Sequence, residues 1–248
     1  MRKKLVIGNW KMNGSLALCR SMLPALAKLA VPNVDLVVAP PAVYLAEATR
    51  LLAGQWLAVA AQDVSAHVAG SHTGECAVPM LHELGCRYVL VGHSERRNAH
   101  GESDAACLAK VKACLAGGLI PVLCVGETGD EREQRRTLAV LQRQLSGLQG
   151  LDGLASVVVA YEPVWAIGSG RAAAVRDIAE VHGFIRSLLR EYGDRDQACR
   201  ILYGGSVTTH NAGEILCLQD VDGALVGGAS LSVDSFAAIH AQAVASRS

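Results

Sequence analysis

Eight short runs of apolar, mostly β-branched residues recur along the chain, and this repetition constrains the fold more than any other feature. The runs do not alternate polar with apolar residues, so they suit strands of a parallel sheet whose outer face is covered. They are Leu5 to Gly8, Val34 to Ala39, Leu57 to Ala61, Tyr88 to Val91, Ile120 to Val125, Val157 to Tyr161, Ile201 to Tyr203 and Val221 to Val226.

Helical stretches separate these runs, so strand and helix alternate along the whole length. Examples are Ser15 to Ala30, Glu102 to Ala116, Glu131 to Ser146, Val175 to Tyr192 and Asp234 to Ala245. Eight such units of one composition favour an α/β fold closed into a (β/α)8 barrel, with eight parallel strands and an outer ring of helices. The length of 248 residues fits this fold, and no linker divides the chain, so we expect one domain over 1-248.

Composition excludes several classes of protein. Hydrophobic residues make up 51% and charged residues 19%, which argues against disorder. Lys plus Arg and Asp plus Glu number 23 each, so no overall field favours nucleic acid or a membrane surface. Leu5 to Ile7 is too short for a secretory signal, and no apolar run approaches the roughly 20 residues of a membrane span. We expect a cytoplasmic protein whose eight cysteines are reduced.

Polar residues and glycines follow five of the predicted strands, at the point where each strand ends. In (β/α)8 barrels such positions meet at the C-terminal face, where active sites are built. The residues are Asn9, Lys11, His93, Glu95, Glu162, Ser206, Gly227 and Gly228. We therefore expect them to line one mouth of the barrel.

Glu162 follows the apolar run Val157 to Tyr161 and precedes Pro163, which places its carboxylate at a fixed and poorly hydrated point. That environment suits a base. A surface glutamate at a strand end is the alternative for Glu162 considered alone. The other segments at the same mouth favour the base.

His93 and Lys11 would share the mouth with this carboxylate. Ser94 is a good N-cap for a short helix beginning at Glu95, so the positive end of that helix would face His93 and keep its ring neutral. A neutral imidazole can donate a hydrogen bond to a substrate oxygen. The ammonium of Lys11 would stabilise an anionic substrate and a developing enolate, with Glu95 holding it by an ion pair.

Three glycine-rich stretches supply backbone donors: Gly168 to Gly170, Gly204 to Ser206 and Gly227 to Ser230. Two of them follow the seventh and eighth strands, where these barrels commonly bind phosphate. Glycines that merely allow tight turns are the alternative. The position favours a phosphate site.

Competing motifs fail on inspection. Gly168 to Ala173 matches GxGxxA, but this stretch does not directly follow its strand, as dinucleotide binding requires. His82-Glu83 begins an HExxH pattern whose second histidine is replaced by Cys86. There is no P-loop and no GxSxG elbow. The sequence thus offers no basis for a metal or nucleotide site.

Five ordered motifs resemble triosephosphate isomerases, and the resemblance covers essentially the whole chain. They are GNWKMN at Gly8 to Asn13, QDVSAHVAGSHTGE at Gln62 to Glu75, GHSERR at Gly92 to Arg97, YEPVWAIGSG at Tyr161 to Gly170 and YGGSV at Tyr203 to Val207. The resemblance implies a TIM barrel that interconverts dihydroxyacetone phosphate and glyceraldehyde 3-phosphate in glycolysis and gluconeogenesis. It also implies that no metal or cofactor takes part.

Residue roles follow from the same resemblance. Glu162 matches the catalytic base of the family and His93 its electrophile, while Lys11 and Asn9 match the substrate-binding pair. The amides that hold phosphate correspond to Gly168, Ser206, Gly227 and Gly228.

Pro163 to Arg171 matches the mobile lid of the family. Trp165 and Ile167 would form its apolar tip, with Gly168 and Gly170 as hinges. The chain departs from the common pattern at Ser169, Arg171 and Ser232, where Thr, Lys and Lys are usual. These departures bear on lid motion and not on the reaction.

The stretch Ala66 to Pro79 is long for a connection in a barrel and lacks helical or strand periodicity. Its Thr73-Gly74-Glu75 segment matches the interdigitating loop of a homodimer. By this resemblance, Thr73 would reach the partner's Asn9 and the partner's Lys11.

Two alternatives remain open at this stage. One is another phosphosugar isomerase or synthase on the same barrel, and the other is a catalytically silent barrel that binds phosphorylated metabolites or a protein partner.

Overall fold

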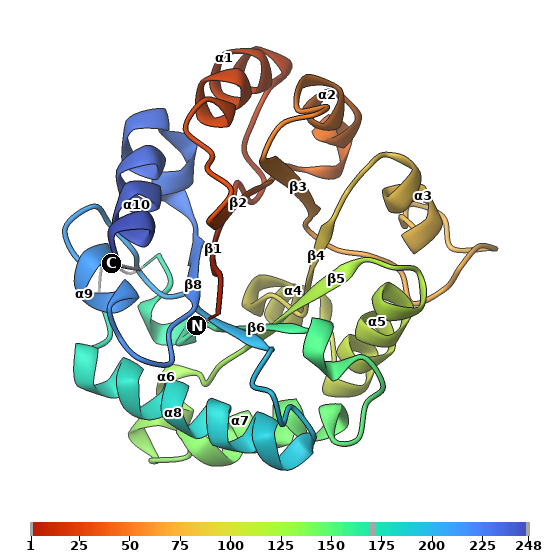
Figure 1. Ribbon diagram of the computed structural model, residues 1–248. Helices are drawn as coiled ribbons and strands as arrows, with labels where there is room; N and C mark the ends of the chain where they lie inside the picture. Colours follow the sequence, from red (N-terminus) through yellow and green to blue (C-terminus); the bar gives the residue numbers. More distant parts are fainter. Residues whose placement is uncertain (1, 169–171, 247–248) are drawn as a thin grey trace.

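The computed structural model describes residues 2–168 and 172–246, and its centre is a closed barrel of parallel strands (Figure 1). Among the described residues there are eight strands, which pair in chain order, with β8 closing against β1. They are β1 Lys4–Asn9, β2 Val34–Ala39, β3 Leu57–Ala61, β4 Tyr88–Val91, β5 Ile120–Val125, β6 Val158–Tyr161, β7 Arg200–Tyr203 and β8 Gly223–Val226. The expected (β/α)8 barrel is confirmed.

Helices surround the barrel and cover its outer face (Figure 1). They are α1 Leu16–Ala27, α2 Leu45–Leu51, α3 Val78–Glu83, α4 Ser94–His100, α5 Asp104–Ala116, α6 Gly129–Glu133, α7 Thr137–Leu145, α8 Val175–Tyr192, α9 Ala212–Leu216 and α10 Val233–Ala245. Within the described part of the chain, no helix is long and apolar enough to cross a membrane.

Two apolar layers explain why the strands read as continuous apolar runs. Leu5 and Ile7 of β1 point into the barrel, whereas Val6 between them packs under the outer helices. Both faces of each strand are therefore buried, and burial of this kind supplies most of the driving force for folding. The inner layer includes Leu5, Ile7, Val37, Ala39, Ala60, Tyr88, Leu90, Val122, Cys124, Val158, Ala160, Leu202 and Leu225.

One predicted helix is divided. The stretch Glu131 to Ser146 was expected to be continuous, but α6 ends at Glu133 and α7 begins at Thr137. A capping box between Thr128 and Glu131 starts α6 early, and Arg135 has a φ of 56°, which no α-helix accommodates. The prediction of a single helix was therefore wrong.

The last strand begins later than expected, at Gly223 instead of Val221. A Cβ at Gly223 would lie 1.8 Å from the carbonyl oxygen of Leu5, so only glycine allows this approach to β1. Asp222 stands just outside the strand, where its side chain accepts a hydrogen bond from the backbone of Ile201 at 2.8 Å.

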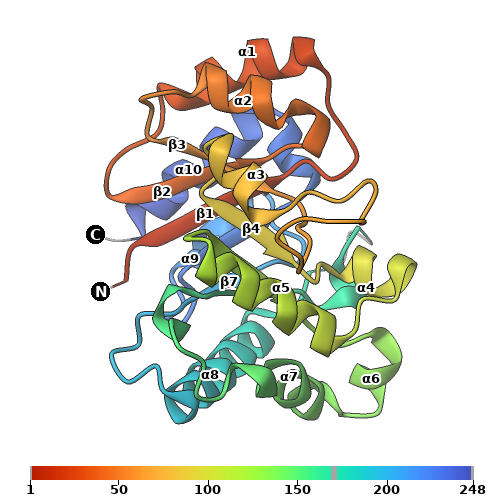
Figure 2. The same cartoon turned by 90° about the vertical axis from the view of Figure 1, so that its right-hand side faces the viewer.

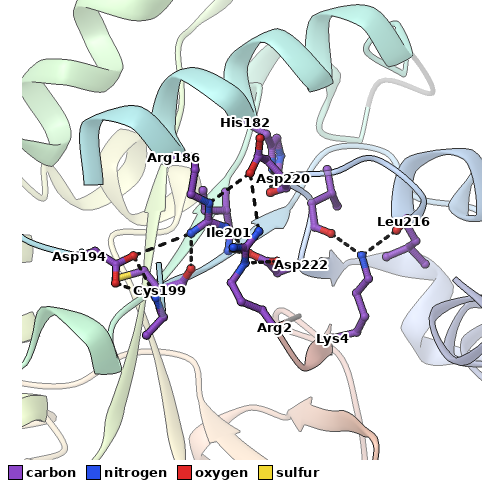
Figure 3. Close-up of polar contacts among 12 residues, drawn as sticks. Arg2, Lys4, His182, Arg186, Asp194, Cys199, Ile201, Leu216, Asp220 and Asp222 are labelled. Atoms are coloured by element: carbon purple, nitrogen blue, oxygen red, sulfur yellow. Dashed lines mark hydrogen bonds and ion pairs between the residues drawn. The ribbon is translucent and has the colours of Figure 1, made fainter. Parts of the chain in front are cut away.

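A largely buried ionic cluster lies at the N-terminal end of the barrel strands (Figure 3). Arg186 of α8 bonds the carboxylate of Asp222 and the carbonyl of Cys199, and Asp220 and Asp194 lie 3.3 and 3.9 Å from its guanidinium. Arg2 also pairs with Asp220 and Asp222. Lys4 instead donates to the carbonyl oxygens of Leu216 and Val221 (Figure 3). The start of β1 lies at this end, opposite α4 and α6 (Figure 2).

Candidate active site

Glu162 directly follows β6 at the C-terminal end of the barrel, and only 2% of the residue is exposed. Two glycines leave the space that Glu162 occupies. A Cβ at Gly126 would lie 1.8 Å from the carbonyl oxygen of Glu162, and a Cβ at Gly204 would lie 2.8 Å from its Cγ. Real Cβ atoms do not approach so closely, so both positions require glycine for the present location of the carboxylate.

The Glu162 carboxylate faces His93. Its Oε1 lies 3.3 Å from Nε2 of the imidazole, and its Oε2 accepts a hydrogen bond from the backbone N–H of Ser94 at 3.1 Å. Both side chains are buried, with 6% of His93 exposed. A carboxylate and an imidazole at this distance can exchange a proton through a small substrate placed beside them.

His93 itself caps helix α4. The helix begins at Ser94, and Nδ1 of His93 accepts the backbone N–H of Glu95 at 3.2 Å. The predicted cap, Ser94, is the first helical residue instead, so that prediction was wrong. An imidazole that accepts on Nδ1 carries its proton on Nε2, which directs an N–H toward Glu162.

Asn9 is the last residue of β1, and Lys11 stands on the loop that follows. The Lys11 ammonium donates to Oε1 of Glu95 at 2.6 Å, as the sequence predicted. The backbone of Lys11 is left-handed, with a φ of 52°, and its N–H donates to Oδ1 of Asn9 at 2.9 Å. Asn9 is 5% exposed. Asn9, itself a predicted site residue, thus braces the loop that carries Lys11.

One cavity of about 330 Å³ brings most of the predicted site together. Its lining includes Asn9, Lys11, His93, Glu162, Gly168, Ser206, Gly227 and Gly228. Of the predicted site residues, Glu95 lies outside this lining and reaches it through Lys11. In the part of the chain that the structure describes, no group of three or more His, Cys, Asp or Glu side chains could hold a metal ion.

The described part of the predicted lid is anchored by a residue that the sequence did not reveal. Glu127 is fully buried and accepts the indole N–H of Trp165 at 2.8 Å and the hydroxyl of Tyr161 at 3.2 Å. Burial and then Glu127 raise the pKa of Tyr161. The guanidinium of Arg132 lies 4.3 Å from the centre of the Trp165 ring. Ser169, Gly170 and Arg171 lie outside the described residues.

Cys124 is a second neighbour of the base that sequence reasoning missed. It lies in β5 and points into the barrel. Burial, followed by the nearby Glu162, raises the pKa of this thiol well above its usual value. Its apolar strand could be predicted, but the alternation of inward and outward residues alone did not show which face Cys124 takes.

The 66–79 loop follows β3 and has no helix or strand over residues 66 to 77. Its Thr73, Gly74 and Glu75 are exposed. A second cavity, of about 480 Å³, opens beside Lys11 and Glu95, and Met12 at its rim is 96% exposed. The chain therefore presents both a protruding loop and a hollow next to the site.

Comparisons with known proteins place the chain in one family. A family model described as triosephosphate isomerase matches residues 4–243. The chain is 49% identical to the triosephosphate isomerase of Paracidovorax citrulli, over 98% of its own length and 99% of the relative's. It is 50% identical to that of Thiobacillus denitrificans, over 96% and 98%, and 51% identical to that of Cupriavidus pinatubonensis, over 96% and 99%. The chain belongs to the triosephosphate isomerase family.

Proposed function

We propose that this protein is a triosephosphate isomerase that interconverts dihydroxyacetone phosphate and D-glyceraldehyde 3-phosphate, a step of glycolysis and gluconeogenesis. The observation that carries the proposal is the buried Glu162 carboxylate, 3.3 Å from Nε2 of His93, in a cavity that Lys11 also lines. Base, hydrogen-bond donor and cation are the three groups that an aldose–ketose isomerisation needs. We propose that the reaction needs no cofactor.

The reaction begins at Glu162. Its carboxylate removes a proton from the carbon beside the substrate carbonyl, and the electrons of that C–H bond shift toward the carbonyl oxygen. Nε2–H of His93 donates to this oxygen and stabilises the resulting enediolate. His93 then moves protons between the two oxygens. Glu162 returns its proton to the neighbouring carbon, which completes the isomerisation without loss of atoms or electrons.

The remaining predicted residues bind and orient the substrate. The ammonium of Lys11 stabilises the phosphorylated substrate and the enediolate charge, and Glu95 holds it in place. Backbone amides at Ser206, Gly227 and Gly228 bind the phosphate, because glycine-rich loops after the last two strands let an anion approach closely. Gly168, which follows β6 and lines the same cavity, supplies a further amide. Asn9 contacts the substrate from the end of β1.

We also propose that the protein works as a cytoplasmic homodimer in which residues 1-248 form one catalytic domain. The 66–79 loop of each subunit would enter the hollow beside the partner's Lys11. This pairing is supported by the protruding loop, the adjacent cavity and the strongly exposed Met12. A two-fold dimer allows the contact to be made reciprocally.

A coupled assay tests the activity. Glyceraldehyde 3-phosphate is supplied with an NADH-dependent reductase for dihydroxyacetone phosphate, and NADH loss is followed. We expect rapid turnover that requires no added metal. Turnover of a larger phosphosugar but not of triose phosphates would instead support the rival barrel isomerase, and binding without turnover would support a silent barrel.

A further inference from the structure

The backbone of Lys11 is held in a conformation that an L residue adopts only with support. Its φ of 52° lies in the left-handed region, where the side chain crowds the following carbonyl. Oδ1 of Asn9 accepts the N–H of Lys11 at 2.9 Å and so holds one side of the residue. On the other side, the backbone carbonyl of Lys11 accepts a hydrogen bond from a second donor.

Gln62 supplies that donor. Its Nε2 lies 2.8 Å from the carbonyl oxygen of Lys11 and 2.8 Å from that of Ala39. An amide between two carbonyl oxygens must present its NH2 group, because its own oxygen would repel both. The two contacts therefore fix the orientation of the Gln62 side chain and use both of its hydrogens.

The contact ties together the ends of three neighbouring strands. Gln62 follows β3, Ala39 ends β2 and Lys11 follows β1. The Gln62 side chain therefore holds the loop after β1 against the ends of the two neighbouring strands. The Lys11 side chain leaves this backbone to reach Glu95 at 2.6 Å. On its way it passes the phosphate loop, where a Cβ at Gly227 would lie 3.7 Å from Cε of Lys11.

We propose that Gln62 is a positioning residue of the reaction, which fixes the ammonium of Lys11 by holding its backbone carbonyl. The inference rests on the function proposed above, since it concerns the cation of that same site. Gln62 makes no contact with the reacting atoms in this role. Without its amide, the Lys11 backbone would relax out of the left-handed region and carry the ammonium away from Glu95 and Gly227.

The first test replaces the amide by an apolar group of the same length. Gln62→Met should lower kcat/KM by about tenfold to a hundredfold, since a displacement near 1 Å can cost that much. Both a higher KM and a lower kcat are expected, because the ammonium would act on the bound substrate and on the enediolate. Gln242→Met is the matched control: its amide also donates to a loop carbonyl, that of Thr209 at 2.7 Å, and it should keep wild-type kinetics.

A double-mutant cycle then separates positioning from general support of the fold. Lys11→Met removes the ammonium but keeps the carbonyl that Gln62 holds. If Gln62 acts through the ammonium, adding Gln62→Met to Lys11→Met should cost no more than about threefold further. Losses that multiply would overturn the proposal, as would a Gln62→Met variant with wild-type kinetics.

Sedimentation and circular dichroism of each variant complete the experiment. A Gln62→Met variant that is folded but has lost the assembly of the wild type would assign the effect to assembly and overturn the proposal. If Gln62→Met does not fold, Gln62→Glu replaces it. Its carboxyl can donate only when protonated, so its kcat/KM relative to wild type should rise as pH is lowered, and a flat ratio overturns the proposal. A wild-type protein without triose phosphate turnover would refute the proposed function instead.

Discussion

At the scale of single residues, the site depends on glycines, which have no side chain, as much as on the residues that carry the chemistry. Glu162 carries the proposed chemistry, but Gly126 and Gly204 leave the space in which it sits. The location of Glu162 at the mouth of the barrel could be predicted because it directly follows an apolar strand. The need for the two glycines could not, because it arises from contacts between loops that are distant in sequence.

Shortening the base should slow the reaction without weakening binding. Glu162→Asp keeps the charge but withdraws the carboxylate by roughly 1 Å, which should lower kcat about a hundredfold. Steady-state kinetics in both directions measure the effect. Glu214→Asp, at an exposed position of α9, is the control and should leave kcat unchanged. Wild-type kcat in Glu162→Asp would remove Glu162 from the role of base.

A methyl group behind the base should have a similar effect. In Gly204→Ala the added Cβ would stand 2.8 Å from Cγ of Glu162, so the carboxylate must move and kcat should fall at least about tenfold. Gly183→Ala, where a Cβ on α8 meets nothing within 4 Å, should keep kcat and stabilise the fold by about 1 kcal/mol. Equal kcat in both variants would contradict the packing argument.

At the scale of elements, helix α4 sets the chemistry of His93. Because Nδ1 accepts the N–H of Glu95, the ring should carry its proton on Nε2 in the ligand-free protein. Nitrogen-15 NMR of labelled histidine can assign the tautomer, with His93→Gln identifying the signal. A ring protonated on Nδ1 at neutral pH would contradict the assigned geometry and the proposed donor role.

The strands were predictable to within one or two residues, because burial on both faces leaves continuous apolar runs. The start of α4 was not predicted correctly. Serine is the usual cap by local preference, but the position of His93 between Glu162 and Glu95 is set by packing across the barrel. Gln62 was missed for the same reason, since its partner Lys11 lies far from it in the chain and no periodicity links them.

At the scale of the whole molecule, a buried histidine at the N-terminal end of the barrel makes stability depend on pH. His182 is fully buried there beside the ionic cluster, and its Nδ1 lies 3.1 Å from the carbonyl oxygen of Asp220 (Figure 3). Burial lowers the pKa of His182 to about 4. The folded state therefore binds a proton at His182 only near pH 4, whereas the unfolded chain binds it near pH 6.5.

Stability should consequently fall as pH drops from about 6.5 to about 4, because only the unfolded chain binds the proton in this window. Between pH 6.5 and pH 5 the contribution of His182 to the loss is about 1.5 kcal/mol. Urea unfolding at one protein concentration measures it. In His182→Asn, the loss of unfolding free energy between pH 6.5 and pH 5 should be smaller by about 1.5 kcal/mol. The same change at the exposed His210, His210→Asn, should leave the loss as it is. An unchanged slope in His182→Asn would refute this origin.

The final prediction concerns assembly and the exposed Thr73 of the 66–79 loop. If that loop enters the hollow beside the partner's Lys11, Thr73→Arg would bring a second cation against an ammonium with little water to screen it. The variant should be a folded monomer with sharply reduced turnover, because the first loop of each site would lose its brace. Sedimentation, circular dichroism and kinetics are measured on one sample.

Ala139→Arg, at an exposed position of α7, adds the same charge away from the loop and should leave both assembly and turnover unchanged. The comparison separates a local clash from a general effect of charge. A Thr73→Arg protein that is monomeric and fully active would show that the site is complete within one subunit. A wild type that is active while sedimenting as a monomer would do the same, and in either case the barrel alone would suffice for catalysis.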